Sequence, residues 1–141
     1  MKDGEFLDTN IHIYARDKTD IEKQNIARQL VKKIWKSNTG VISIQVFCGF
    51  FWVSTRKIKN PLTPAKANSI IKNLSTWNVH SPNYENIENA IKKVSKYKIS
   101  FLDAMIIESA AAMNCHTLWS EDLHDGAVYD GVRVRNPFNP K

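Results

Sequence analysis

Short apolar segments alternate with longer amphipathic segments along this chain, and this alternation constrains its fold more than any other feature. The short segments have the length of buried strands and comprise residues 5–8, 41–42, 77–80 and 116–119. The longer segments carry apolar residues at helical spacing and comprise residues 19–37, 43–58, 64–75, 81–94 and a stretch after Ser100. The pattern predicts an α/β fold in three layers, α/β/α, with a central mainly parallel sheet.

Two further elements are predicted in the C-terminal part of the chain. In the helix after Ser100 we expect Leu102, Met105 and Ile106 on the apolar side, and residues 132–134 are expected to form an edge strand.

A length of 141 residues with 43% hydrophobic content predicts a single domain over residues 1–141. No stretch approaches the roughly 20 apolar residues of a membrane span, and the acidic N-terminus is unlike a signal peptide. We therefore expect a cytoplasmic protein with no membrane partner.

Three aspartates occupy positions that the predicted sheet would bring together. Asp8 follows the first strand, Asp122 follows the fourth, and Asp103 opens the helix before that fourth strand. Functional residues of open α/β sheets gather at the carboxyl ends of the strands. Clustered carboxylates repel one another unless a divalent cation neutralises them, and such hard oxygen ligands suit Mg²⁺ or Mn²⁺. The pattern favours metal-assisted phosphodiester hydrolysis, although each aspartate alone also fits a helix cap, a first-turn acid or a turn residue.

The balance of charge favours a polyanionic partner. The chain contains 20 Lys and Arg against 14 Asp and Glu, for a net charge of +6. Basic residues that neutralise phosphates release counterions, which favours binding to nucleic acid. Solvated helix faces explain many of these lysines equally well. The candidates for contact with an RNA backbone are Arg16, Arg56 and Lys57.

Several short segments resemble the motifs of PIN-domain proteins, in the same order and across essentially the whole chain. Residues 6–11, Phe-Leu-Asp-Thr-Asn-Ile, resemble the opening motif, in which a strand ends in Asp-Thr-Asn. Residues 100–106 resemble the internal motif, in which Asp-Ala lies at the start of a helix. Residues 120–126 resemble the C-terminal motif, and residues 132–138 resemble the ending of the VapC-type branch.

The resemblance implies a PIN-like fold and a Mg²⁺- or Mn²⁺-dependent endoribonuclease, the toxin of a bacterial toxin–antitoxin pair. It implies an RNA substrate, a cognate antitoxin that covers the active site, and a homodimer. The catalytic acids that it implies at the metal site are Asp8, Asp103 and Asp122. The residues that it implies in support of these acids are Thr9, Ser120 and Asp125.

One position departs from the family pattern. In residues 45–51 the family has an acid, normally Glu, where this chain has Gly49. Glycine inside a helix costs roughly 1 kcal/mol relative to alanine, so it is not there for helix stability. Two explanations stay open: a naturally degenerate protein, or a Glu→Gly change selected because the active toxin harmed its host during cloning. Either one predicts weakened metal binding and reduced nuclease activity, although glycine also permits close helix packing.

Other functions fit the sequence less well. Gly49 keeps open a non-catalytic PIN-fold module that binds RNA or an antitoxin without cleavage. A phosphatase with an aspartyl nucleophile would need a second acid two positions after the first, where this chain has Asn10. A dinucleotide-binding enzyme would need a glycine-rich turn after the first strand, and none is present.

Overall fold

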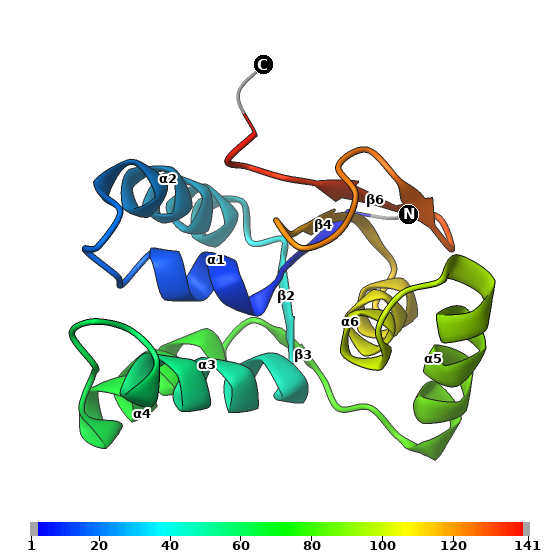
Figure 1. Cartoon of the computed structure of the whole chain (residues 1–141), viewed down its shortest axis with the longest axis horizontal. Coiled ribbons are helices and arrows are strands. Elements are labelled where there is room, and N and C mark those ends of the chain that lie inside the picture. The colour runs from blue at the N-terminus through cyan, green and yellow to red at the C-terminus, as the bar shows by residue number, and fades with distance from the viewer. Residues whose placement is uncertain (1–2, 140–141) are drawn as a thin grey trace.

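The computed structural model describes residues 3–139 and has a mixed α/β architecture (Figure 1). The helices are α1 (Thr9–Tyr14), α2 (Ile21–Ser37), α3 (Ile44–Arg56), α4 (Pro64–Leu74), α5 (Tyr84–Tyr97) and α6 (Phe101–Ala112). The strands are β1 (Gly4–Leu7), β2 (Gly40–Ser43), β3 (Asn78–His80), β4 (Cys115–Trp119), β5 (Val128–Tyr129) and β6 (Val132–Arg135). Over this part of the chain, no helix is long and apolar enough to cross a membrane.

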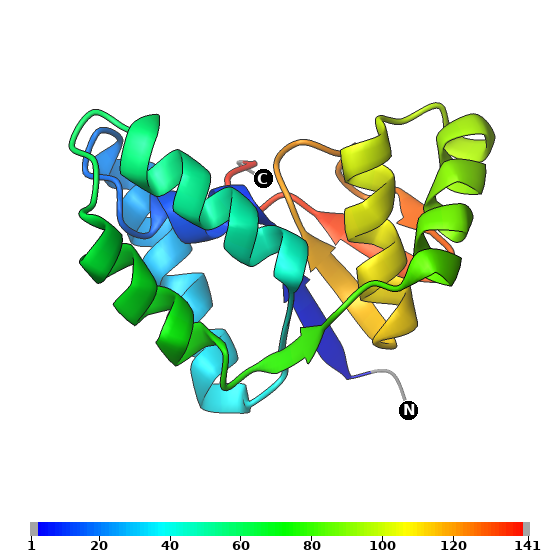
Figure 2. The same ribbon diagram turned by 90° about the horizontal axis from the view of Figure 1, so that it is seen from below.

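The strands form one sheet in the order β3-β2-β1-β4-β6-β5, and every pair except β5–β6 is parallel. The helices α1 to α4 lie on one side of the sheet, and α5 and α6 lie on the other (Figure 2). The predicted three-layer α/β/α fold with a mainly parallel sheet is therefore confirmed. The first three strands follow one another from the centre of the sheet to one edge, and β4 then pairs with the other side of β1. The strand order thus reverses between β1 and β4.

Apolar side chains of the two central strands hold the layers together. Phe6 and Leu7 of β1 and Leu118 of β4 are fully buried, as is Ile42 of β2. Burial of a side chain of this size contributes roughly 1.5–3 kcal/mol. Because both faces of these strands are covered by helices, successive residues are apolar rather than alternating. The core therefore fixes the strand ends from which the candidate site residues extend.

Polar residues at the strand and helix boundaries determine where the helices begin. The Ser43 side chain accepts a hydrogen bond from the Val46 N–H and caps α3. Ser100 caps α6 in the same way through the Asp103 N–H, at 3.1 Å. These caps satisfy N–H groups that have no partner inside the helix. They set the register of α3 and α6 and hence the positions of residues 49 and 103.

Two expectations about the C-terminal part were wrong. Residues 132–134 belong to β6, which is not an edge strand, because β5 pairs with its outer side. An Asp-Gly turn at Asp130 and Gly131, both with positive φ, adds this short extra strand. Leu102 was expected on the apolar side of its helix but is 65% exposed, because it lies in the first turn of α6 beyond the packed part of the helix.

Candidate active site

The candidate site lies where the strand order reverses. β1 and β4 are parallel neighbours, with Leu7 opposite Trp119, so the residues that follow them emerge side by side. The Asp8 N–H donates a hydrogen bond to the Trp119 carbonyl at 2.9 Å and extends the pairing past the end of β1. Crevices at such reversal points are the usual ligand sites of open α/β sheets.

Asp8 is buried at this end of the sheet and is held by two donors. Its Oδ1 accepts a hydrogen bond from the Thr9 N–H at 2.7 Å, which caps α1. Its Oδ2 accepts a hydrogen bond from the Ser120 hydroxyl at 2.9 Å. Ser120 is itself fully buried. The structure therefore brings Asp8, Thr9 and Ser120 together as one hydrogen-bonded group.

Asp122 joins the same group from the loop after β4. Its backbone N–H donates to the Ser120 hydroxyl at 3.1 Å, so one serine connects the two aspartates. Its Oδ2 accepts a hydrogen bond from the Asn10 side-chain amide at 2.8 Å. Sequence reasoning assigned Asn10 no role in the site. Its place two residues after Asp8, in the first turn of a helix, is the signal that would have suggested one.

The three aspartates influence one another electrostatically. Burial raises the pKa of Asp8 to about 6, the hydrogen bonds from Ser120 and Thr9 oppose this rise, and the charges of Asp122 and Asp103 add to it. Burial also raises the pKa of Asp122, and the charges of Asp103 and Glu121 raise it further. In the part of the chain that the structure describes, no Lys or Arg forms an ion pair with any of the three. The crevice therefore holds uncompensated negative charge.

The donor chemistry of this crevice fits a hard divalent cation. Among residues 3–139, no three Asp, Glu, His or Cys side chains stand close enough together to enclose a metal ion by themselves. Mg²⁺ does not need such a cage, because it retains several waters and binds through one or two carboxylates together with substrate phosphates. Asp8 and Asp122 supply carboxylates of that kind, and Asp103 lies near enough for its charge to raise the pKa of both. A divalent cation suits this place because the side chains offer carboxylate oxygens and their negative charges have no ion-pair partner among the described residues.

Gly49 lies beside this group on α3. A Cβ atom at position 49 would approach the Thr9 side chain, with Cγ2 at 3.3 Å and Oγ1 at 3.4 Å. Thr9 is the residue next to Asp8, so a side chain at position 49 would start beside the residues that hold Asp8. The contact is also tighter than most Cβ contacts, so glycine allows α3 and α1 to pack closely here. Both interpretations of Gly49, a missing acid and a packing residue, are thus consistent with its place.

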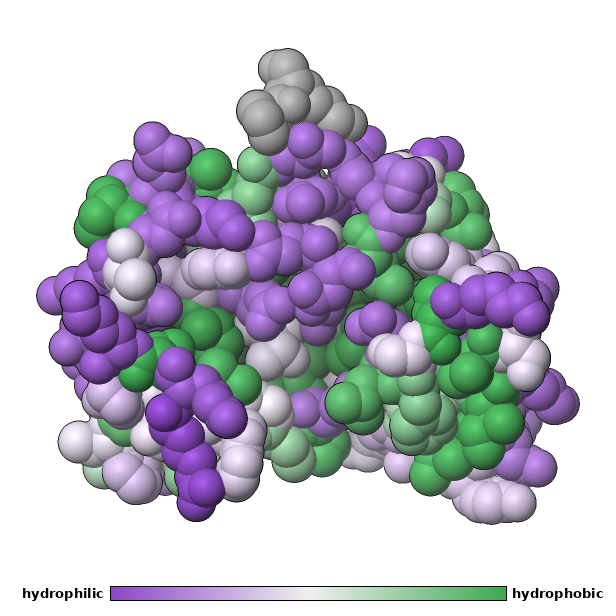
Figure 3. Space-filling model, viewed as in Figure 1, coloured by the Kyte–Doolittle hydropathy of each residue, from purple (hydrophilic) through white to green (hydrophobic). Residues whose placement is uncertain are grey.

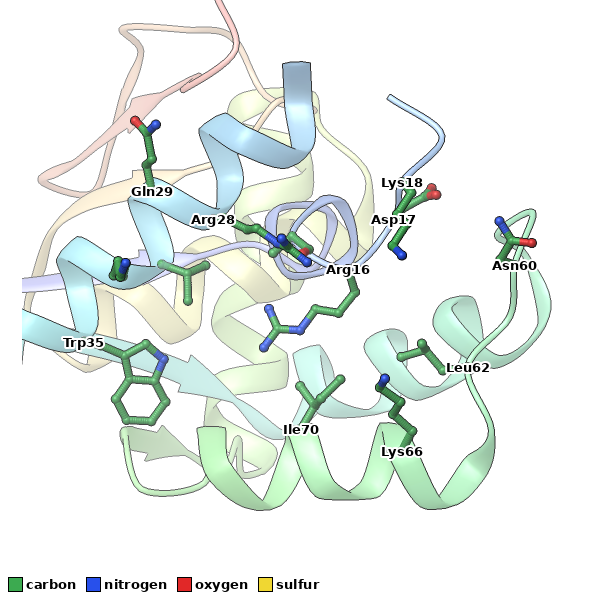
Figure 4. Close-up of a pocket in the computed structure, with 13 residues that line it drawn as sticks. Arg16, Asp17, Lys18, Arg28, Gln29, Trp35, Asn60, Leu62, Lys66 and Ile70 are labelled. Carbon is green, nitrogen blue, oxygen red and sulfur yellow. The ribbon is translucent and has the colours of Figure 1, made fainter. Parts of the chain in front are cut away.

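The other predicted residues lie farther from the crevice. Asp125 accepts hydrogen bonds from the Asn136 N–H at 3.0 Å and the Asn139 side chain at 2.7 Å, and so holds the C-terminal segment. Arg16 follows the far end of α1 and lines a separate groove (Figure 4). The Arg56 guanidinium lies over the Trp52 ring, 4.1 Å from its centre, at the end of α3. Lys57 comes directly after that helix. The structure does not bring these three cations together.

Comparisons with known proteins give one family and a consistent set of folds. The PIN domain family model matches residues 6–124. No curated protein matches the chain significantly. The chain is similar to a toxin–antitoxin complex from Klebsiella pneumoniae, with 19% identity and a TM-score of 0.72, over 97% of this chain and 100% of the other.

Two further solved structures resemble it. The sarcin–ricin-loop-cleaving toxin VapC20 of Mycobacterium tuberculosis is 17% identical with a TM-score of 0.66, over 84% of this chain and 92% of that toxin. DNA-bound VapBC from Salmonella typhimurium is 14% identical with a TM-score of 0.66, over 97% of this chain and 99% of the other. At these identities the likeness establishes a shared fold.

Proposed function

This chain belongs to the PIN-domain family, and on that premise we propose that it is a Mg²⁺- or Mn²⁺-dependent endoribonuclease, the toxin of a toxin–antitoxin pair, weakened by glycine at position 49. The observation that supports the proposal is the pair Asp8 and Asp122 at the carboxyl ends of β1 and β4, which Ser120 connects by hydrogen bonds. The charge of Asp103 raises the pKa of both, and no Lys or Arg among residues 3–139 forms an ion pair with any of the three. Uncompensated carboxylates at this place suit phosphodiester chemistry better than a structural role, because their repulsion reduces stability.

Each residue of this group would have its own role. Asp8 and Asp122 would bind the cation, and the charge of Asp103 would add to the negative electrostatic potential around it. When bound, Mg²⁺ or Mn²⁺ would supply an activated water and neutralise charge on the phosphodiester. The Ser120 hydroxyl orients the Asp8 carboxylate, and the Asn10 amide orients Asp122. With a pKa of about 6, Asp8 is mostly ionised at neutral pH and available to the cation.

The glycine at position 49 is the proposed cause of weak metal binding and weak RNA cleavage. A carboxylate there would start from a Cβ next to Thr9, beside the residues that hold Asp8. Its absence leaves three acids where the family pattern has four, so the field that retains the cation is weaker. The chain would then bind its metal and cleave RNA less well than a variant with the acid restored.

Exposed apolar residues support the proposed protein partners. Phe101 and Leu102 of α6 and Tyr84, Ile87 and Ile91 of α5 are exposed. Figure 3 shows hydrophobic residues gathered at the lower right of the molecule, over these two helices. Contiguous exposed apolar surface is typical of an interaction site, and we propose that a second copy of the chain covers it. A cognate antitoxin, as in the VapBC complexes of similar fold, completes the proposed set of partners.

A cleavage assay tests this function. We would incubate the chain, Gly49→Glu and the uncharged control Gly49→Gln with structured RNAs and Mg²⁺ or Mn²⁺. Restoring the acid is expected to raise cleavage on the order of 10- to 100-fold, the size of change that follows alteration of a metal-site group. Gly49→Gln should stay at the level of the unmodified chain, and adding Asp8→Asn to Gly49→Glu should abolish cleavage.

Two other outcomes would change the conclusion. Equal cleavage by the unmodified chain and Gly49→Glu would mean that three acids suffice and that the glycine is tolerated. No cleavage by any folded, metal-loaded variant would favour the second candidate, a PIN-fold module that binds RNA or an antitoxin without cutting. Gly49 is the observation that keeps this second candidate open.

A further inference from the structure

A basic groove opens at the end of α1 opposite to the acids. It has a volume of about 840 Å³ and lies between α2 and α4, next to the turn that follows α1 (Figure 4). The cationic side chains that line it are Arg16, Lys18, Arg28, Lys32 and Lys66. Of the lining residues, only Asp17 carries a carboxylate, and its Oδ1 already accepts hydrogen bonds from the Thr19 N–H and hydroxyl.

The structure shows no anionic partner for these cations in the part of the chain that it describes. Within residues 3–139, none of the five lining Lys and Arg residues forms an ion pair. Arg16 is only partly exposed and points into the groove (Figure 4). Burial and the nearby charge of Arg28 lower the pKa of Arg16. Positive charges held close together repel one another, and here no counter-ion offsets that repulsion within residues 3–139. Such an arrangement indicates a binding site for an external anion.

Trp35 forms one wall of this groove and presents an aromatic surface. Its side chain is 41% exposed, while one edge packs against Trp77 at a centroid distance of 5.3 Å and an angle of 72°. Trp35 also lines an adjoining hollow with Lys32, Lys33 and Lys36 on the outer side of α2. An indole fixed at one edge and surrounded by cations is the arrangement on which nucleic-acid bases stack while their phosphates are neutralised.

We propose that this groove, lined by Trp35, Arg16, Arg28 and Lys66, binds a single-stranded segment of RNA. One unpaired base stacks on Trp35, and the flanking phosphates pair with the arginines and Lys66. Asp8 caps the start of α1 and Arg16 lies two residues beyond its end, so the groove and the acids lie at opposite ends of this short helix. The inference rests on the proposed function and assigns to it a substrate with an unpaired base outside the cleavage site.

The test measures RNA binding without cleavage. Fluorescence anisotropy would follow a labelled single-stranded RNA 12-mer and a duplex of the same sequence in EDTA, so that the acidic crevice contributes no metal contact. Trp35→Ala should weaken single-strand binding roughly 5- to 100-fold, the effect of one lost stacked base, and Trp35→Phe should restore most of it. Arg28→Gln and Lys66→Gln should each lower the slope of log affinity against log salt by about 0.7. Lys92→Gln, an exposed lysine on α5, is the matched control and should change neither value.

The groove variants also define the results that would overturn the proposal. If Trp35→Ala is folded by circular dichroism and binds the single strand as the unmodified chain does, the groove is not an RNA site. If Trp35→Ala is unfolded, an unchanged affinity and salt slope in the Arg28→Gln and Lys66→Gln variants overturns it instead. A designed Leu/Glu amphipathic peptide is the third probe. Trp35-dependent binding of this peptide, without Trp35-dependent binding of RNA, would assign the groove to an acidic protein partner. Because these measurements need no metal, their failure is distinct from a failure of the cleavage assay.

Discussion

Asp8 is held in a place that favours its protonated form. Burial and two neighbouring aspartates raise its pKa from 3.8 to about 6, against two hydrogen bonds that favour the ionised form. A carboxyl whose pKa is higher in the folded than in the unfolded chain binds more protons when folded. The free energy of unfolding therefore falls as the pH rises from about 4 to about 6. The ionised carboxylate costs about 3 kcal/mol above this window, a cost that a bound cation would offset.

Asp8→Asn removes this cost and so predicts a pH-dependent gain in stability. Relative to the unmodified chain, its free energy of unfolding should increase by about 2.5 kcal/mol between pH 4 and pH 7.5. Urea denaturation in EDTA at both pH values measures the difference. Glu88→Gln, which changes an exposed acid on α5, serves as the control and should show a nearly constant difference. A pH-independent effect of Asp8→Asn would contradict the burial of an ionisable group at this position.

At the scale of elements, α5 and α6 are joined by a buried charge network. The Lys93 Nζ lies 2.7 Å from a Glu108 oxygen and 2.8 Å from an Asp130 oxygen. The second Glu108 oxygen accepts hydrogen bonds from Asn86 and Asn89. The network holds the layer of helices that carries Asp103.

Lys93→Met should therefore destabilise the protein far more than a change at its neighbour. Removing one partner of a buried pair leaves Glu108 as an uncompensated charge, at a cost of about 3–5 kcal/mol. The double variant Lys93→Met with Glu108→Leu should recover part of this loss. Lys92→Met alters an exposed lysine on the same helix and is expected to stay within about 0.5 kcal/mol of the unmodified chain. Chemical denaturation measures all three, and equal effects at positions 92 and 93 would refute a structural role for the network.

The helices and strands with clear hydrophobic periodicity were the part of the fold that the sequence predicted correctly. The helices predicted from residue 43 and after Ser100 begin there, and the apolar segments became strands of a mainly parallel sheet. β5 was missed because it has only two residues and depends on the turn at Asp130 and Gly131. The exposure of Leu102 was missed because helical periodicity does not show where a helix extends beyond its neighbours.

At the scale of the whole molecule, the reversal of strand order between β1 and β4 determines where chemistry is possible. It brings Asp8 and Asp122 to one crevice although 113 positions separate them in sequence, and the strand-end rule predicted this proximity. The contact of Asn10 with Asp122 could have been suspected from its place two residues after Asp8. The groove at Trp35 was not predictable, because it depends on which side chains of α2, α4 and the turn after α1 meet in space, and local sequence does not carry that information.

We infer that the three aspartates form a site for a hard divalent cation and that Gly49 weakens it. Titration with Mn²⁺, followed by electron paramagnetic resonance of the free ion, measures that binding. We expect weak binding by the unmodified chain, at least about tenfold tighter binding by Gly49→Glu, and loss of binding in Asp8→Asn. Gly49→Gln should bind as the unmodified chain does. Equal Mn²⁺ binding by the unmodified chain and Asp8→Asn would rule out this site, because the metal would then lie away from Asp8.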